Sequence, residues 1–460
     1  MKILLVQPPP RRIEYESIIV PPLGLAYLAA VLETREHDVR ILDAFAERQS
    51  WTDFEKAVQG AGADLIGIGG MTPVIDNTHR AVKICRPCCK HLVIGGPHVT
   101  LSKDHLFEEF PEVDYAVYGE GEETLAELVE HLDQKKEARG IAGTVDRHAV
   151  NPSRPPVQDL DRLPFPARHL LPSRRYSYLF AKRKRVTTMF TSRGCPYQCI
   201  FCDKAVFGSK CRMRSAENVL NEIGEILGRF KDISIIFYDD LFTLNKERVI
   251  RICQGILERR FKFDWKCEGR VDRIDREMLG WMKRAGCSMI AYGVESGNQA
   301  GLDYLGKNTK VEDIRKAFRL TRESGIGTMA YFILGIPVET FQDEIRSIEF
   351  AKEIDPDYVQ FSILSPFPGT PLYNAAVKDG SYRELGVQSP ADKDLKKPAL
   401  VSLNWNEKSL NEIMHRAHQS FYFRPRYMIK RLASLSNLKD LGRLWGAGLK
   451  VLSWKVKKGP

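Results

Sequence analysis

The sequence lacks any long apolar run, and no stretch approaches the roughly 20 residues that a helix needs to cross a bilayer. Its first residues, Met1–Pro10, also lack the hydrophobic region and small-residue cleavage site of a secretory signal. We therefore expect a cytoplasmic protein. A chain of 460 residues is too long for one ordinary core, which favours two or three domains.

Neither a disulfide framework nor a broad basic surface is indicated. The cytosol keeps thiols reduced, so any closely spaced subset of the ten cysteines is better explained by metal or cluster binding. The net charge of +10 is concentrated in residues 421–460, which contain ten Lys or Arg and one acidic residue, Asp440. Because the rest of the chain is close to neutral, we expect no nucleic-acid-binding face.

The first part of the chain alternates short apolar runs with helical patterns. Lys2–Gln7, Asp64–Gly70 and His91–Gly95 have the apolar character of strands, and the last two are continuous enough to be buried on both faces. This predicts a doubly wound, Rossmann-like α/β domain over residues 1–144, whose ligands bind at the carboxyl ends of the strands. None of the strand-end loops has the pattern GxGxxG, so a dinucleotide ligand is not favoured.

A second alternation begins after a segment rich in Pro, Arg and Ser. Residues 145–185 predict an interdomain linker on the surface. Over residues 186–375, six strand patterns alternate with helical patterns and predict a partial TIM-like (β/α)6 barrel, with its chemistry at the carboxyl ends of the strands. Residues 376–460 predict a polar, then basic, helical region. The expected barrel strands are Val186–Thr191, Ile233–Tyr238, Phe263–Glu268, Ser288–Val294, Thr328–Leu334 and Tyr358–Leu364.

The segment that carries the chemistry follows the first expected barrel strand. Cys195, Cys199 and Cys202 are separated by three and two residues, so one loop can wrap one inorganic cluster. Thiolates suit an iron–sulfur cluster, and three of them leave one iron open to a substrate. A structural zinc site is the alternative, but zinc needs a fourth ligand at matching spacing, and Cys211 is the only near candidate.

The spacing Cys-x3-Cys-x-aromatic-Cys resembles the signature of radical S-adenosylmethionine (SAM) enzymes. Together with the N-terminal sheet, it makes the chain similar to the cobalamin-binding radical SAM family over about residues 1–375. Other motifs typical of that family are Leu163–Arg168, Phe237–Thr243, Gly293–Gly297, Gly335–Pro337 and Pro368–Pro371.

The resemblance implies roles for residues of the barrel. The three cysteines would bind three irons of a [4Fe–4S] cluster, and SAM would chelate the fourth iron. Phe201 would lie against the adenine, and the backbone at Tyr238 and Asp239 would hold the SAM amino group. Arg270 would pair with the SAM carboxylate, and Glu295 would accept hydrogen bonds from the ribose hydroxyls.

Simpler roles remain open for some of these residues. Asp239 and Asp240 are also suited to capping the helix that follows them. Arg270 and Asp272 are also suited to forming a surface ion pair.

The resemblance also implies cobalamin in the N-terminal domain, where glycine-rich loops at 69–72 and 95–97 would let the backbone approach the corrin. Ordinary turn chemistry needs the same glycines. The Asp-x-His-x-x-Gly motif of cobalamin-dependent mutases is absent, so we expect no histidine on cobalt. His98 is the nearest substitute and is expected to bond backbone or solvent instead. The residues expected to contact cobalamin are Met71, Thr72, Gly95, Gly96 and Pro97.

A second group of cysteines, Cys85, Cys88 and Cys89, ends an expected helix. No further metal ligands lie nearby in the sequence, which favours incidental free thiols over a second metal site.

The activity implied by the resemblance is methylation of an unactivated carbon. An electron delivered to the cluster cleaves SAM to methionine and a 5′-deoxyadenosyl radical, which takes hydrogen from the substrate before methylcobalamin delivers the methyl group. The alternatives are an oxidative cyclase without methyl transfer, a non-catalytic cobalamin sensor and a tRNA-modifying radical enzyme. A sensor would not need the cysteine triad. A tRNA-modifying enzyme would more often carry an RNA-binding module and a second cluster.

The expected partners are a small-molecule or lipid-like substrate and an external one-electron reductant such as flavodoxin or ferredoxin. Phe421–Met428 is aromatic and basic, and apolar residues recur after it at near-helical spacing among Lys and Arg. Such a pattern is compatible with peripheral contact with an anionic membrane. A helix packed across the barrel mouth is the alternative. The recurring apolar residues are Leu441, Leu444, Trp445, Leu449, Leu452 and Trp454.

Overall fold

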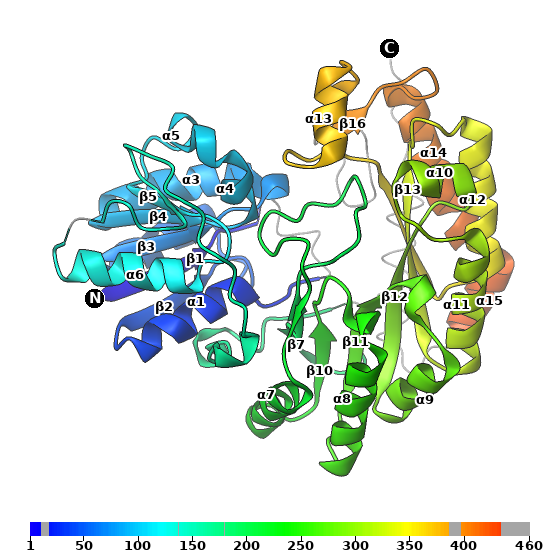
Figure 1. The fold of residues 1–460 in the computed structure, drawn as a ribbon, viewed down its shortest axis with the longest axis horizontal. Helices are drawn as coiled ribbons and strands as arrows, with labels where there is room; N and C mark the ends of the chain where they lie inside the picture. The colour runs from blue at the N-terminus through cyan, green and yellow to red at the C-terminus, as the bar shows by residue number, and fades with distance from the viewer. Residues whose placement is uncertain (11–17, 137, 179, 386–396, 434–460) are drawn as a thin grey trace. The chain divides into compact units, whose positions relative to one another are not determined.

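The computed structural model describes residues 1–10, 18–136, 138–178, 180–385 and 397–433 (Figure 1). They form two compact units. The first unit comprises Met1–Pro196, Lys204–Phe242 and Glu247–Cys267. The second unit comprises Tyr197–Asp203, Thr243–Lys246 and the residues from Glu268 onward.

The N-terminal part of the first unit is a six-stranded sheet with the strand order β2-β1-β3-β4-β5-β6. Strands β1 to β5 pair in parallel, and β6 pairs antiparallel with β5. This order confirms the doubly wound α/β domain. The strands are β1 (Lys2–Gln7), β2 (Asp38–Asp43), β3 (Leu65–Gly69), β4 (His91–Gly95), β5 (Tyr115–Val117) and β6 (Thr144–Val145).

Helices cover both faces of this sheet because successive side chains of each strand point to opposite faces (Figure 1). Ile3 and Leu5 pack beneath α1 (Leu23–Thr34) and α6 (Glu122–Asp133). Leu4 and Val6 face the other layer of helices. That layer contains α2 (Trp51–Ala61), α3 (Ile75–Cys85), α4 (Pro97–Ser102) and α5 (Leu106–Glu109).

The second large sheet has the order β14-β13-β12-β11-β10-β7, and the registered pairs within it are parallel. This arrangement confirms the expected partial (β/α)6 barrel. The strands are β7 (Arg185–Met189), β10 (Ile233–Phe237), β11 (Asp264–Gly269), β12 (Cys287–Glu295), β13 (Gly327–Leu334) and β14 (Tyr358–Ile363). The helices that alternate with them are α7 (Ala216–Arg229), α8 (Lys246–Glu258), α9 (Arg276–Arg284), α10 (Gln299–Tyr304), α11 (Val311–Glu323) and α12 (Phe341–Ile354).

The segment between the two sheets does not lie simply on the surface, as the sequence led us to expect. Leu160, Ala167 and Tyr176 are buried, and so is the side chain of Arg168. Its guanidinium forms an ion pair with Glu222 of α7 at 2.6 Å. Composition predicted a linker because Pro and Arg are common in exposed segments. Here Ala167 packs in the core of the N-terminal domain and Arg168 donates to the carbonyl of Thr188 in β7 at 2.8 Å.

The described part of the C-terminal region is not helical throughout. After α13 (Pro371–Lys378) the chain forms an antiparallel pair, β15 (Tyr382–Leu385) and β16 (Lys397–Leu400). Helices α14 (Glu407–Tyr422) and α15 (Pro425–Ala433) follow.

Part of the segment proposed from the sequence to face lipid is used in packing, although Met428 is 46% exposed. Phe421 and Tyr427 are buried, and Arg424 forms an ion pair with Asp355 at 2.8 Å. The apolar series from Leu441 to Trp454 lies outside the described residues. Among the helices that are described, none combines the length and apolar character needed to cross a membrane.

Candidate active site and cofactor-binding residues

The cysteine loop is closed at its base by two short strands that the sequence analysis missed. Strand β8 (Ser192–Arg193) pairs antiparallel with β9 (Arg212–Met213). Gly194, just after β8, has a φ of +86°, and a side chain there would meet the carbonyl oxygen of Lys210 at 2.5 Å. Only glycine accommodates that backbone and that contact, so the residue before Cys195 is fixed by the geometry of the loop.

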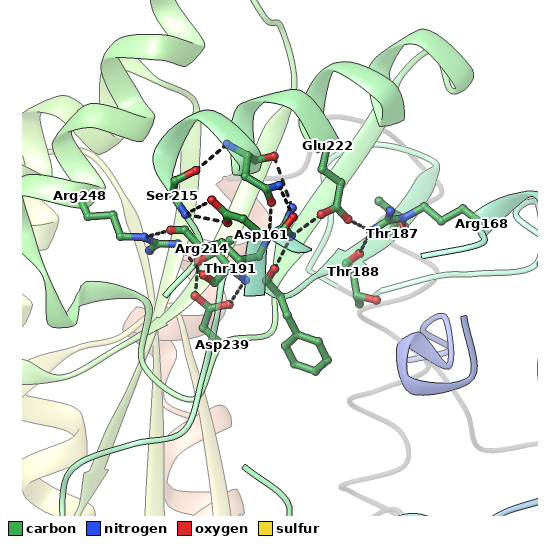
Figure 2. A network of polar contacts seen from close by, with 12 residues as sticks. Asp161, Arg168, Thr187, Thr188, Thr191, Arg214, Ser215, Glu222, Asp239 and Arg248 are labelled. Atoms are coloured by element: carbon green, nitrogen blue, oxygen red, sulfur yellow. Dashed lines mark hydrogen bonds and ion pairs between the residues drawn. The ribbon is translucent and has the colours of Figure 1, made fainter. Parts of the chain in front are cut away.

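Two carboxylates accept hydrogen bonds that fix the beginning of this loop. Asp239 accepts hydrogen bonds from the backbone N–H of Thr191 at 2.5 Å and from the Thr191 hydroxyl (Figure 2). It also accepts from the Ser192 hydroxyl at 2.9 Å. Asp240 accepts from the backbone N–H of Gly194 at 2.9 Å. Burial raises the pKa of both carboxyl groups. The Asp239 and Asp240 side chains therefore shape the cysteine loop, and the proposed contact with SAM concerns only the backbone here. Tyr238 is 42% exposed beside them.

A connected polar network supports the same region from behind. Arg248 donates to the carbonyl oxygens of Thr191 at 2.6 Å and of Arg214 at 2.8 Å. Figure 2 shows Glu222 between Arg214 and Arg168, and it forms ion pairs with both. The strand end before the cysteines is therefore fixed by buried polar contacts.

None of the three predicted cluster ligands is buried or joined in a disulfide. Cys195 and Cys199 are partly exposed and Cys202 is exposed. Over the described ranges, no three His, Cys, Asp or Glu side chains are placed to hold a metal ion. The donor set itself, three accessible thiols in one loop, has the chemistry that an iron–sulfur cluster takes. By contrast, burial raises the pKa of the Cys211 thiol to about 11.

Phe201 lies between two of these cysteines in the sequence and against an apolar group of the second unit. It packs with Leu305, Ile336 and Leu372, while the neighbouring Ile200 donates its N–H to the carbonyl of Leu305 at 3.1 Å. Ile200 and Phe201 are thus part of the apolar packing of the second unit.

Arg270, predicted to bind the SAM carboxylate, is buried instead of forming a surface ion pair. It pairs with Asp272 at 2.8 Å and donates to the carbonyls of Lys307 and Asn308, at 3.1 Å for the latter. Its guanidinium also lies 3.6 Å from the ring centroid of Tyr197. These contacts use some of the N–H donors of the Arg270 guanidinium and fix its orientation.

Glu295, predicted to bind the ribose, has an unusual backbone. Its φ is +66°, in a region that residues with side chains seldom adopt, and β12 carries a bulge at this point. Its carboxylate pairs with the buried ammonium of Lys307 at 2.6 Å. Conformations of this kind persist where the surroundings impose them, often at functional sites. Lys307, which the sequence analysis did not single out, positions Glu295.

The strand-end loops predicted to face cobalamin lie against each other. The N–H of Gly70 donates to the carbonyl of Gly95 at 2.8 Å. Gly96 has a φ of +108°, and a side chain there would meet the carbonyl of Gly70 at 2.7 Å. The glycines thus have a local packing role. Beside them, Met71 and Val74 are 52% and 41% exposed, which gives this edge of the sheet the apolar surface that a corrin ring requires.

His98 has both ring nitrogens engaged by the protein. Nδ1 lies 3.1 Å from the Thr72 hydroxyl, and Nε2 lies 3.0 Å from the Glu109 carboxylate. The same carboxylate contacts His79 at 3.2 Å. The side chain of His98 is held within the helical layer, so it is poorly placed to coordinate cobalt. Pro97 begins the short helix α4 that carries it.

The group Cys85, Cys88 and Cys89 has the character of ordinary thiols. Burial raises the pKa of all three, that of Cys89 to about 11. The thiols of Cys88 and Cys89 each lie 3.5 Å from a carbonyl one helical turn earlier. These contacts agree with packing rather than metal binding.

Comparisons with known proteins agree with the geometry. A model of the B12 binding domain matches residues 17–129, and a model of the radical SAM superfamily matches residues 189–351. The uncharacterized methyltransferase PH0819 of Pyrococcus horikoshii is 33% identical over 439 residues, 94% of each chain. An anaerobic magnesium-protoporphyrin IX monomethyl ester cyclase of Rubrivivax gelatinosus is 30% identical over 77% of this chain and 66% of the cyclase.

A solved structure shows the same fold. It is that of the radical SAM methyltransferase TsrM from Kitasatospora setae with cobalamin and a [4Fe–4S] cluster bound. It matches with a TM-score of 0.75 and 17% identity over 98% of both chains.

The fold and the two domain matches define an enzyme that joins a cobalamin-binding domain to a radical SAM barrel. The chain belongs to the family of cobalamin-dependent radical SAM methyltransferases, whose cofactors are a [4Fe–4S] cluster, SAM and cobalamin.

Proposed function

We propose that this chain methylates an unactivated carbon of a small molecule, with the cluster held by Cys195, Cys199 and Cys202. The observation that carries the proposal is the accessible cysteine loop closed by β8 and β9 directly after the first barrel strand. When bound, the cluster and SAM supply a carbon-centred radical and cobalamin supplies the methyl group. The protein's part is to bind, orient and exclude water.

The residues of the second unit are suited to binding SAM. Arg270 offers the remaining part of its guanidinium to the carboxylate, in a direction fixed by Asp272 and Tyr197. Glu295, held by Lys307, offers its carboxylate to the ribose hydroxyls. Phe201 offers an aromatic face to the adenine. In the first unit, the backbone at Tyr238 and Asp239 remains the proposed contact for the SAM amino group.

In the N-terminal domain, the proposed corrin contacts are the two loops at the ends of β3 and β4. The exposed side chain of Met71 and the backbone of Thr72 and Gly95–Pro97 are the groups assigned to the corrin. We propose that cobalt has no histidine ligand, because both nitrogens of His98 are already engaged.

Anaerobic reconstitution tests the cluster assignment. The wild-type chain is expected to bind one [4Fe–4S] cluster by Mössbauer spectroscopy and to form 5′-deoxyadenosine after reduction. A variant with Cys195, Cys199 and Cys202 all changed to Ala is expected to lose both. Cys211→Ala is the matched control, because it removes a nearby thiol and is expected to retain the cluster. Reductive SAM cleavage by the triple variant would refute the assignment.

The likeness to a cyclase makes ring formation the second candidate reaction. Products of a reduced reaction with deuterated-methyl SAM distinguish the two by mass spectrometry. A labelled methyl group in the product supports methyl transfer, whereas an unlabelled product that has lost hydrogen supports cyclisation. The electron is proposed to come from an external reductant such as flavodoxin or ferredoxin, and replacing it by dithionite should support the same products.

A further inference from the structure

Four buried charged side chains join the N-terminal domain to the cysteine loop within the first unit. Arg193 donates to Glu122 at 2.5 Å, and Arg212 donates to Glu120 at 3.0 Å. Arg193 also lies 3.6 Å from Glu120. The exposed fractions of the four side chains are 4–7%. We call these residues, Glu120, Glu122, Arg193 and Arg212, the charge clamp.

On the loop side, the clamp contacts β8 and β9, the two short strands that close the base of the loop. Arg193 and Arg212 are directly opposite each other in the β8–β9 pairing. Cys195 follows Arg193 by two residues. The two guanidinium groups therefore hold both ends of the loop that carries the predicted cluster ligands.

Aromatic contacts fix one of these arginines further. The guanidinium of Arg193 lies 5.2 Å from the ring centroids of both Tyr27 and Phe207. Tyr27 belongs to α1 of the N-terminal domain, whereas Phe207 belongs to the loop itself. Arg193 is therefore held by both partners of the contact and has little room to move on its own.

On the domain side, the clamp continues into the strand-end loops proposed to face the corrin. Glu122 is the first residue of α6, in the segment that follows β5. Gly119, just before the glutamates, donates its N–H to the Thr100 hydroxyl at 3.1 Å. That hydroxyl donates in turn to the carbonyl of Gly96 at 2.9 Å. A continuous set of short contacts thus runs from Gly96 to Cys195.

The four buried charges of the clamp depend on one another. Two acidic and two basic groups neutralise each other at sites removed from water. Separating the loop base from α6 would leave buried charges without partners, which is far less favourable than either the closed clamp or full hydration. We call the arrangement seen here closed. If the clamp were separated, the base of the loop would lose its charged partners.

We propose that the charge clamp couples the two cofactor sites, so that cobalamin and the cluster each raise the chain's affinity for the other. Cobalamin at the strand ends stabilises the Gly96–Thr100–Gly119 contacts and with them the closed clamp. A cluster on the loop stabilises the same closed arrangement from the other side. By linkage, the two effects are equal in size. The coupling rests on the proposed positions of both cofactors.

Cobalamin binding to the full-length chain measures the coupling. Hydroxocobalamin is titrated anaerobically into chain with and without reconstituted cluster, and Kd is read from its absorbance. The expected result is a Kd about 5-fold or more lower when the cluster is present, the lower end of typical allosteric couplings. The reciprocal measurement is the loss of iron to a chelator, which cobalamin is expected to reduce.

Two conservative variants remove the coupling without removing either site. Glu122→Gln keeps a hydrogen-bond acceptor for Arg193 but removes the negative charge. Arg193→Lys keeps the positive charge but removes the planar guanidinium with its paired N–H donors. In both, the Kd with and without cluster is expected to agree within about 2-fold. Glu130→Gln is the matched control, because Glu130 lies on the same helix and makes an exposed pair with Arg35. It should retain the wild-type ratio.

The outcomes separate this proposal from the assignment of the sites. A wild-type chain that binds both cofactors with independent affinities would overturn the coupling and leave the sites standing. Wild-type coupling that persists in both variants would overturn the role of the clamp. Should the variants not fold, hydrogen exchange of the wild-type chain decides. Cobalamin alone is expected to slow exchange at Ser192–Gly194, and unchanged exchange there would count against the proposal.

Discussion

Three glutamates of the first unit and three of the second are neutralised in different ways. In the first unit, Glu120, Glu122 and Glu222 each face an arginine. In the second unit, burial raises the pKa of Glu339 and Glu344, and raises that of Glu268 to about 7. An arginine remains charged at any pH at which a protein folds, whereas a proton is lost as the pH rises. The ion pairs of the three glutamates of the first unit therefore keep their cation at any such pH. Contacts of carboxyls with a raised pKa, including those of Asp239 and Asp240 in the first unit, depend on pH.

The carboxyls of the second unit lie beside candidate binding residues. Glu339 accepts from the hydroxyl of Ser296, which follows Glu295, at 2.6 Å. Glu344 accepts from the N–H of Gly335 at 2.7 Å at the end of β13. The charge of Glu295 also raises the pKa of Glu268, after the larger effect of burial. Carboxyl groups with a raised pKa therefore lie beside residues proposed to hold SAM.

Removing Glu222 should give the largest effect and would test the pairing in the first unit. Glu222→Ala leaves the buried guanidinium groups of Arg168 and Arg214 without their carboxylate, since Glu222 has no exposed side-chain surface. We expect a loss of about 3–5 kcal/mol in the free energy of unfolding, measured in urea. The loss should change little between pH 6 and pH 8.

The control for this variant lies on the same helix. Glu217→Ala breaks an ion pair with Arg259 in which the Glu217 side chain is 69% exposed. Its expected cost is below about 1 kcal/mol. Similar losses for the two variants would show that the buried pairing adds nothing.

Glu268 provides the sharpest contrast, because its neutralisation depends on pH. A carboxyl whose pKa is raised in the folded chain stabilises the fold fully below its unfolded pKa and loses that contribution as the pH passes 7. At pH 8 the ionised group should cost on the order of 3 kcal/mol relative to pH 4. Glu268→Gln retains an acceptor for the hydroxyl of Tyr331, now 3.2 Å away, and should remove the loss. Unfolding curves at pH 5 to 8 measure it, and equal slopes for both chains would contradict the assignment.

Much of this architecture follows from patterns that the sequence displays. Continuous apolar runs such as His91–Gly95 identify buried strands, and β4 has these bounds. One of the helical patterns expected between the barrel strands is α12 (Phe341–Ile354), capped by the Thr340 hydroxyl, which accepts from the Asp343 N–H. The cysteine spacing identified the cluster loop because its ligands are local in sequence.

The clamp and the support of Glu295 were not predictable in this way. Glu120 and Arg212 are far apart in the sequence, and each alone has the pattern of an ordinary exposed charge. The same is true of Lys307, which holds Glu295 across a turn and a helix. Buried ion pairs are set by how elements pack, and local patterns carry no signal for them. The glutamates in Gly119–Glu122 were visible only as part of a glycine-rich loop.

Glu344 tests the same contrast between arginine-paired glutamates and carboxyls with a raised pKa, with a smaller expected change in stability. It shares a hydrogen bond with Glu339, and burial together with that neighbour raises its pKa well above the usual value. Glu344→Gln keeps an acceptor for Gly335 and a donor for Glu339, so at pH 6 it should cost less than about 1 kcal/mol. As the pH rises, the wild-type chain should lose stability and the variant should not.

Glu344→Ala separates the proton from the hydrogen bonds. It leaves the N–H groups of Gly335 and Ile336 without their acceptor, so it should cost about 2–3 kcal/mol at pH 6. This cost should shrink as the pH rises and the wild-type chain loses stability. A deficit of the Gln variant that grows as the pH rises would show that Glu344 is ionised in the folded chain.

Replacing His98 should not change the ligands of cobalt. This prediction extends the comparison to the strand ends of the first unit that are proposed to bind cobalamin. Its two ring nitrogens lie within 3.1 Å of Thr72 and Glu109, so coordination would require breaking a hydrogen bond to a carboxylate. Such charge-assisted bonds are stronger than neutral ones. The paramagnetic resonance spectrum of the Co(II) form should therefore lack nitrogen splitting from the protein and be unchanged in His98→Ala. That variant should instead loosen α4, where Pro97 and Thr100 approach the strand-end loops, and weaken cobalamin binding modestly. Nitrogen splitting that disappears in the variant would show that the imidazole leaves Glu109 for the metal.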